Sequence, residues 1–79
     1  FKILPLIGHA NGIEDICIDE KNKLIFSASG DKTIKIWDLK TGNCLRTLDG
    51  HVSGICCVKM KDENTIISGS WDKTIKVWD

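Results

Sequence analysis

The chain is 79 residues long, which is enough for one small domain. Its 11 Lys and Arg residues equal its 11 Asp and Glu residues, so no basic field favours a nucleic-acid backbone as partner. With 42% hydrophobic residues and no low-complexity stretch or membrane-length segment, the composition argues against a disordered or membrane-spanning chain. The first residue is Phe1 rather than methionine, which suggests a fragment or a processed product.

Short stretches of alternating apolar residues, separated by polar turns, predict β-strands throughout the chain. No window shows the apolar spacing of a helix. Asp19 to Lys23 is predicted to be a solvated turn, and Gly30 to Lys32 a tight one. In chain order, the first predicted strands are Lys2 to Ile7, Ile13 to Ile18, Leu24 to Ser29, Thr33 to Trp37 and Cys44 to Leu48. Three further strands follow in the same order up to Asp79, and we predict an all-β protein with antiparallel strands.

One twelve-residue pattern occurs twice. Ser27 to Asp38 matches Ser68 to Asp79 at nine of twelve positions, 41 residues further on. A Gly-His pair precedes each copy, at Gly8-His9 and at Gly50-His51. Repetition at about 40 residues, with Gly-His opening and Trp-Asp closing each unit, is typical of the blades of a β-propeller. We divide the chain into two units, residues 1–38 and 39–79.

These motifs resemble those of the WD-repeat β-propeller family, and the resemblance covers essentially the whole chain. A blade of this family has four strands, called a to d. The resemblance implies the order d-abc-d-abc, in which Lys2 to Ile7 is strand d of a preceding blade. Family propellers close a ring of about four to eight blades, whereas this chain has material for two. We therefore expect further blades, from the parent chain or from other copies, to complete the ring.

The resemblance also implies a hydrogen-bonded group of four side chains, a tetrad, in each blade. A buried indole N–H needs an acceptor, and a serine hydroxyl can supply it while donating to a histidine whose other nitrogen donates to an aspartate. The same residue types form a hydrolase triad, but two identical sites in adjacent repeats and the lack of a nucleophile elbow argue against catalysis. The chain is therefore predicted not to be an enzyme. The tetrad residues are His9, Ser27, Asp31 and Trp37, and then His51, Ser68, Asp72 and Trp78.

The cysteines do not occupy matching positions in the two repeats, so a repeated disulfide framework is not expected. We interpret Cys17, Cys44, Cys56 and Cys57 as reduced thiols of an intracellular protein, cytoplasmic or nuclear, mostly packed as small hydrophobes. His51 and the adjacent cysteines lack the spacing of a zinc site, and neighbours on a strand point to opposite faces. We expect neither a metal nor another cofactor.

Trp71 stands before the turn aspartate, where the first repeat has Gly30. In the family, this position and those near the start of strand a face the mouth of the ring, where peptides and proteins dock. The sequence thus predicts a non-enzymatic scaffold with a rigid turn surface for protein or peptide partners. Two alternatives remain: Trp71 packs on a loop of a neighbouring blade, or the blades are structural and contacts lie elsewhere, as in a ubiquitin-ligase substrate receptor or a signalling scaffold. The candidate contact residues are Gly12, Glu14, Gly30, Gly54, Cys56 and Trp71.

Overall fold

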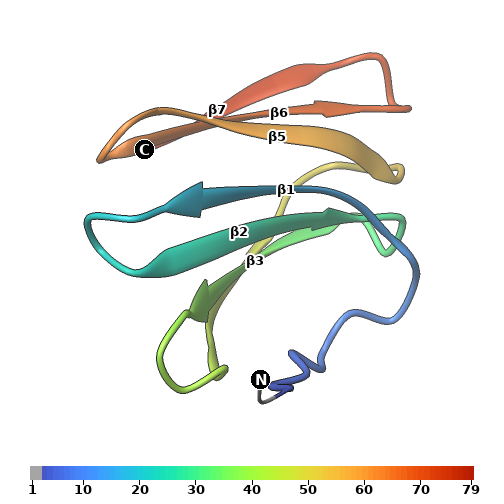
Figure 1. Ribbon diagram of the computed structural model, residues 1–79. Coiled ribbons are helices and arrows are strands. Elements are labelled where there is room, and N and C mark those ends of the chain that lie inside the picture. The colour runs from blue at the N-terminus through green and yellow to red at the C-terminus, as the bar shows by residue number, and fades with distance from the viewer. Residues whose placement is uncertain (1–2) are drawn as a thin grey trace.

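The computed structural model describes residues 3–79, which form two antiparallel β-sheets that pack against each other (Figure 1). No helix occurs among these residues, so none could cross a membrane. The prediction of an all-β protein is confirmed, and the four strands of the first sheet end within one residue of their predicted ends. The first sheet contains β1 (Ile13–Asp19), β2 (Leu24–Ser29), β3 (Thr33–Asp38) and β4 (Cys44–Asp49), in that order. The second sheet contains β5 (Ile55–Asp62), β6 (Thr65–Ser70) and β7 (Ile75–Trp78).

The predicted strand from Lys2 to Ile7 is wrong for the part that the structure describes. Lys2 lies outside the described residues, and Ile3 to Ile7 form no strand. A strand needs a hydrogen-bonded neighbour, and the blade to which this strand was assigned is not part of the chain. The segment lies instead beside the β3–β4 loop (Figure 1). There, a Cβ atom added to Gly42 would be only 3.0–3.1 Å from the Leu4 and Leu6 side chains.

The core lies between the two sheets, where β1 packs beside β5 (Figure 1). Successive side chains of a strand point to opposite faces of the sheet, so each sheet brings one set of apolar side chains to this contact. Burial of this apolar area is the main favourable contribution to holding the sheets together. The buried core residues are Phe26, Ala28 and Ile34 from the first sheet, and Ile55, Val58 and Ile66 from the second.

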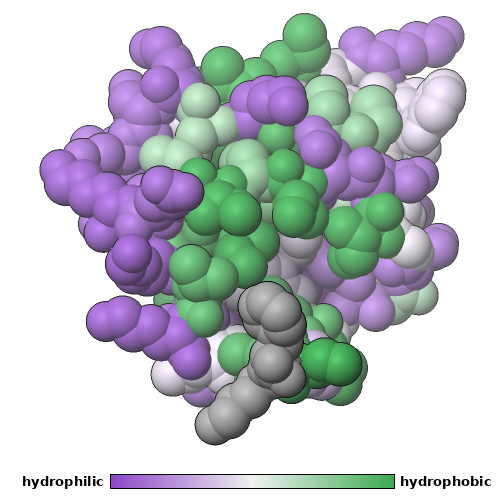
Figure 2. Space-filling view, in the orientation of Figure 1, coloured by the Kyte–Doolittle hydropathy of each residue, from purple (hydrophilic) through white to green (hydrophobic). Residues whose placement is uncertain are grey.

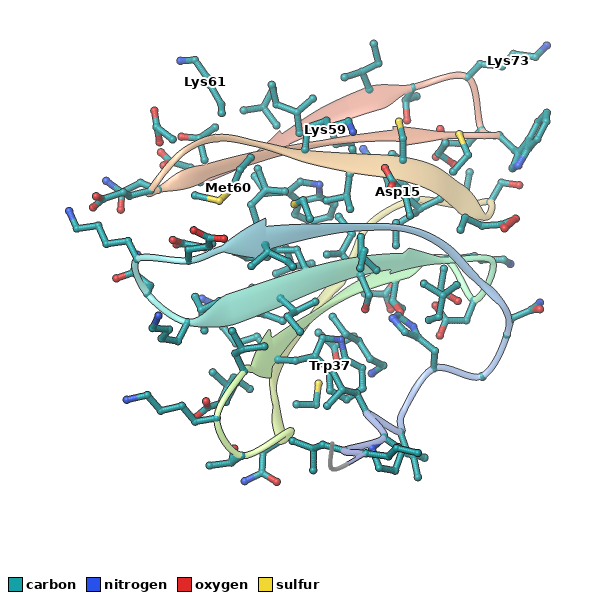
Figure 3. All side chains as sticks on the ribbon, viewed as in Figure 1. Asp15, Trp37, Lys59, Met60, Lys61 and Lys73 are labelled. Atoms are coloured by element: carbon teal, nitrogen blue, oxygen red, sulfur yellow. The ribbon has the colours of Figure 1, made fainter. Side chains whose placement is uncertain are left out.

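A hydrogen bond also joins the two sheets. The Oδ2 atom of Asp15, on β1, accepts the backbone N–H of Val58, on β5, at 3.0 Å. Figure 3 shows Asp15 between these two strands. This contact was not predicted from the sequence. Aspartate is depleted within strands, so its presence in β1 is a signal of a specific role.

The turn after β1 differs from its prediction. Asp19 is only 4% exposed, and its carboxylate accepts hydrogen bonds from the backbone N–H of Asn22 at 3.2 Å and from its side-chain amide at 2.8 Å. These Asn22 hydrogen bonds lower the pKa of the Asp19 carboxyl. Asp19 therefore holds the turn together by an aspartate–turn interaction, and only Glu20 to Lys23 are solvated as predicted.

Both sheets leave their outer face apolar and largely uncovered among residues 3–79. Large exposed residues of the first sheet include Ile13, Ile16 and Ile18, and those of the second include Ile75 and Val77. Figure 2 shows hydrophobic residues gathered in the middle of the visible face, where β1 and β2 lie in Figure 1. Exposed apolar area of this kind marks a surface that another element is suited to cover.

Candidate functional site

The structure brings the four residues predicted in the first repeat into one chain of hydrogen bonds. The Nε1–H of Trp37 donates to Ser27 Oγ at 2.7 Å. The Ser27 hydroxyl donates to Nε2 of His9 at 2.6 Å, and the Nδ1–H of His9 donates to Oδ2 of Asp31 at 2.7 Å. The carboxylate can only accept, which places the imidazole proton on Nδ1. The chain links the loop before β1 to β2, to β3 and to the turn between them.

The second repeat has the same arrangement. Trp78 Nε1 donates to Ser68 Oγ at 2.8 Å, Ser68 donates to His51 Nε2 at 2.8 Å, and His51 Nδ1 donates to Asp72 Oδ2 at 2.8 Å. The imidazole and indole rings meet edge-on, with centroids 6.1 Å apart. The same network of four hydrogen-bonded side chains thus occurs in both repeats, each time between a loop and a three-strand unit. This repetition indicates that the network fixes the blade.

The turn aspartates carry most of the charge in these chains. Burial raises the pKa of Asp31, but hydrogen bonds from the Thr33 hydroxyl, from His9 and from the Ala10 and Thr33 N–H groups outweigh it, so the pKa lies well below its usual range. In the second repeat, the hydroxyl of Thr74 is the largest cause of an equally depressed pKa at Asp72. Both carboxylates therefore remain ionised at neutral pH.

His9, Ser27 and Asp31 have the hydrogen-bond order of a hydrolase triad, but the position of the serine does not suit a nucleophile. Ser27 is 4% exposed and Ser68 is fully buried. Each Oγ atom is held between an indole N–H and an imidazole nitrogen. A nucleophile must reach a substrate carbonyl and an oxyanion hole, and these hydroxyls have no access to either. The geometry favours a structural role.

Four of the six predicted contact residues, Gly12, Gly30, Gly54 and Trp71, lie in one row of turns at the ends of the strands. The N–H of Gly30 donates to the carbonyl of Gly12, and the N–H of Trp71 donates to the carbonyl of Gly54, both at 3.0 Å. The two pairs meet at Gly54, where an added Cβ would be 3.2 Å from the Gly30 Cα. Only a glycine allows the two blades to approach so closely at this point.

Glu14 and Cys56 extend this row onto the strands. They occupy matching positions on β1 and β5, the adjacent strands of the two sheets, and both side chains are exposed. The six predicted contact residues therefore form one connected area, which we call the turn surface.

Trp71 is the largest side chain of the turn surface, and it is 74% exposed. Its place in the turn does not require glycine, because the left-handed residues are Lys32 (φ 76°) and Lys73 (φ 70°). A tryptophan therefore fits before the turn aspartate without backbone strain.

The four cysteines are free thiols. Cys17 is half-buried beside the core, but the other three are exposed, so the prediction that most are packed is wrong within this chain. A β-bulge between Ile55 and Cys57 breaks the alternation that was expected to separate the adjacent thiols. Both thiols contact Gly69: Cys56 donates to its carbonyl at 3.4 Å, and Cys57 Sγ lies 2.9 Å from an added Cβ there. Within residues 3–79, no three His, Cys, Asp or Glu side chains are arranged to hold a metal ion.

The two antiparallel sheets stack face to face, and each contains a Trp–Ser–His–Asp network of hydrogen bonds. This arrangement defines a repeat protein built from β-propeller blades. The model of the family described as "WD domain, G-beta repeat" matches residues 2–38 and again residues 42–79. The chain belongs to this family of WD-repeat proteins.

Similar proteins include subunits of ubiquitin-ligase complexes. The chain is 47% identical over 50 residues to the "Probable E3 ubiquitin ligase complex SCF subunit sconB" of Arthroderma benhamiae. It is 50% identical over 50 residues to the sconB protein of Emericella nidulans, and 44% identical to scon-2 of Neurospora crassa. Each match covers 63% of the chain but only 7–8% of the relative, so the chain spans less than a tenth of these proteins.

Solved structures with the same fold include two computationally designed proteins. The Ika4 protein superimposes with a TM-score of 0.85 at 37% identity, over 99% of this chain and 47% of its own. The Ika8 protein gives a TM-score of 0.80 at 40% identity, over 92% of this chain and 22% of its own. The arrangement of the two sheets therefore recurs within longer chains.

Proposed function

We propose that the chain is a non-enzymatic scaffold whose turn surface binds protein or peptide partners. The observation that carries the proposal is Trp71, an indole that is 74% exposed on a turn whose backbone is fixed. Aromatic side chains with a free N–H are enriched at interface hot spots. The balanced charge gives no support for nucleic acid or an anionic membrane as partner.

The turn surface is suited to binding because it is rigid. The N–H of Trp71 is bonded to Gly54, and the next residue, Asp72, is held by His51 and by the backbone N–H of Val52 at 3.1 Å. The entropy cost of ordering this loop is therefore met on folding and not on binding. A tetrad that fixes the turn aspartate thus contributes indirectly to affinity.

The relatives named as SCF subunits support the class of partner. Their names place them in complexes made of proteins, and the family is generally an interaction domain. We extend to this chain only protein binding and an intracellular location, either cytoplasmic or nuclear, which the free thiols also favour.

The test is binding of selected peptides to the full chain and to its Trp71→Ala variant. Peptides would be selected from a random display library on the unmodified chain and measured by fluorescence anisotropy. We expect Trp71→Ala to weaken binding by roughly 2 kcal/mol, about thirtyfold, and to change the free energy of unfolding by less than about 0.5 kcal/mol. Neutralising Glu14, with Glu14→Gln, should reduce the salt dependence of association.

Leu45→Ala is the matched control, because Leu45 is 53% exposed on β4, in the outer strand of the first sheet. It should leave the affinity for the same peptides within about twofold. If Trp71→Ala lowers stability and leaves affinity unchanged, the indole packs on a neighbouring blade. Equal losses at Trp71 and Leu45, or a library that yields no binder, would instead favour a purely structural role for these blades.

A further inference from the structure

Asn11 precedes Gly12 in the loop before β1, and the two residues are placed for a reaction of the asparagine side chain. The Oδ1 atom of Asn11 accepts the backbone N–H of Gly12 at 2.7 Å. This hydrogen bond holds the amide carbon of the side chain, Cγ, close to the Gly12 nitrogen, which can attack it. Both residues are exposed, so water reaches the loop. Groups that are already held together need less ordering to react.

The surroundings of the loop leave room for this attack. Glycine has no side chain beside its nitrogen, and a Cβ atom added to Gly12 would have no atom within 4 Å. The side chain of Asn11 lies against Gly30, where an added Cβ would be 3.4 Å from the Asn11 Cγ. The lack of a side chain at Gly30 thus provides the space in which the Asn11 amide lies.

A second hydrogen bond makes the Gly12 nitrogen more reactive. The hydroxyl of Ser29 donates to the backbone carbonyl of Asn11 at 3.3 Å. This bond draws electrons from the peptide group between Asn11 and Gly12, so the N–H of that group gives up its proton more readily. Ser29 is fully buried, and its Oγ atom also accepts the N–H of Asp31 at 3.0 Å. The activating hydroxyl is therefore fixed in place.

The second repeat has the same loop without the reactive side chain. Ser53 and Gly54 stand at the positions of Asn11 and Gly12. The hydroxyl of Ser70 donates to the carbonyl of Ser53 at 3.1 Å, as its equivalent does in the first repeat. The hydrogen bond to the loop carbonyl is thus part of both blades, whereas only the first blade combines it with an amide side chain.

We propose that Asn11 is a site of spontaneous deamidation beside the turn surface. The Gly12 nitrogen forms a bond to the Asn11 Cγ, the Cγ–Nδ2 bond breaks, and the proton of the attacking N–H leaves with the amide nitrogen as ammonia. The resulting succinimide ring then adds water at either of its carbonyl groups. Ring opening gives aspartate or isoaspartate, and in isoaspartate the main chain runs through the side-chain carbon. The reaction requires only water.

Both products change the turn surface, and this consequence rests on the function proposed above. Each product adds a carboxylate next to a surface that already carries Glu14. Isoaspartate also lengthens the main chain before Gly12, whose carbonyl accepts the N–H of Gly30 at 3.0 Å. That hydrogen bond holds the first pair of turns together. Deamidation of Asn11 therefore weakens the binding of peptides at the turn surface.

The first experiment follows the full chain by peptide mapping and mass spectrometry during incubation at neutral pH and physiological temperature. The Asn11 amide should be converted to an acid at least about tenfold faster than the other asparagine amides, because only Asn11 precedes glycine. The other asparagines are equally classed as exposed, so access to water does not distinguish them. They are Asn22, Asn43 and Asn64.

Gly12→Ala is the matched variant, because its methyl group meets open space and yet stands beside the attacking nitrogen. The variant should keep its fold, checked by circular dichroism, and its Asn11 should react about tenfold more slowly. Equal rates at Asn11 and Asn64 in the unmodified chain, or an unchanged rate in Gly12→Ala, would overturn the proposal. Neither measurement needs a binding partner, so both are independent of the Trp71→Ala test.

The second experiment measures the effect on binding, with the peptides selected on the unmodified chain. The incubated chain should lose affinity in proportion to the converted fraction of Asn11. Fresh and incubated Asn11→Ser, which carries the residue of the second repeat, should bind equally well. Conversion of Asn11 with full retention of affinity would contradict the effect on the turn surface. Conversion of Asn11 together with no effect of Trp71→Ala would instead refute the proposed function and leave the deamidation site standing.

Discussion

Replacing Asp31 by alanine tests how much a tetrad contributes to stability. The Asp31 side chain is 10% exposed and that of its donor His9 is 4% exposed. The Nδ1–H of His9 would lose its acceptor where little water can enter, which costs about 1–3 kcal/mol. The N–H groups of Ala10 and Thr33 would also lose theirs, but water can reach these turns and limits the cost. We expect Asp31→Ala to lower the free energy of unfolding by about 2–3 kcal/mol in total.

The assay is urea unfolding followed by tryptophan fluorescence, at one protein concentration because association would add to the apparent stability. Glu20→Ala is the control, since Glu20 is exposed in the turn after β1, and it should change stability by less than about 0.5 kcal/mol. Asp31→Asn, which keeps one acceptor oxygen, should lose less than Asp31→Ala. Equal effects of Asp31→Ala and Glu20→Ala would refute the structural role assigned to the tetrad.

Acid should destabilise the chain through the same aspartates. Their pKa values are depressed in the folded state, so their contribution is complete above the ordinary aspartate pKa of about 3.9 and is lost as the pH falls below it. Urea titrations from neutral pH to acid should show this loss, and Asp31→Asn together with Asp72→Asn should flatten it. Separately, Gly54→Ala should cost about 1–2 kcal/mol, because its Cβ would meet the Gly30 backbone at 3.2 Å. Gly12→Ala, with open space around the added Cβ, should unfold at nearly the unmodified urea concentration.

The strands within each sheet could be predicted because their determinants are local. Period-two alternation and short polar turns define β1 to β4 almost to the residue. Ile3 to Ile7 show the same apolar character and yet form no strand, because a strand also needs a partner and no strand of residues 3–79 pairs with them. Local pattern predicts which segments can be strands, whereas pairing is decided by what lies beside them.

The candidate site could be predicted in part, for a related reason. The tetrad residues repeat at fixed spacing, so each copy supports the assignment of the other. Asp15 and Asp19 occur once in their roles, so no second copy supports an assignment, and the position of Asp15 within a strand does not by itself name its partner. The exposure of Cys57 depends on a β-bulge and on an uncovered sheet face, and period-two reasoning describes neither of these.

The differences between the two repeats are informative about function. The residues that fix each blade are identical in both copies, because the same polar chain is buried twice. Two groups of differences lie elsewhere. Gly30 becomes Trp71 on the turn surface, whereas Asp15 becomes Cys57, an exposed thiol on the second sheet. A repeat protein can change these positions without disturbing its blades, and we propose that the turn surface decides the identity of a partner.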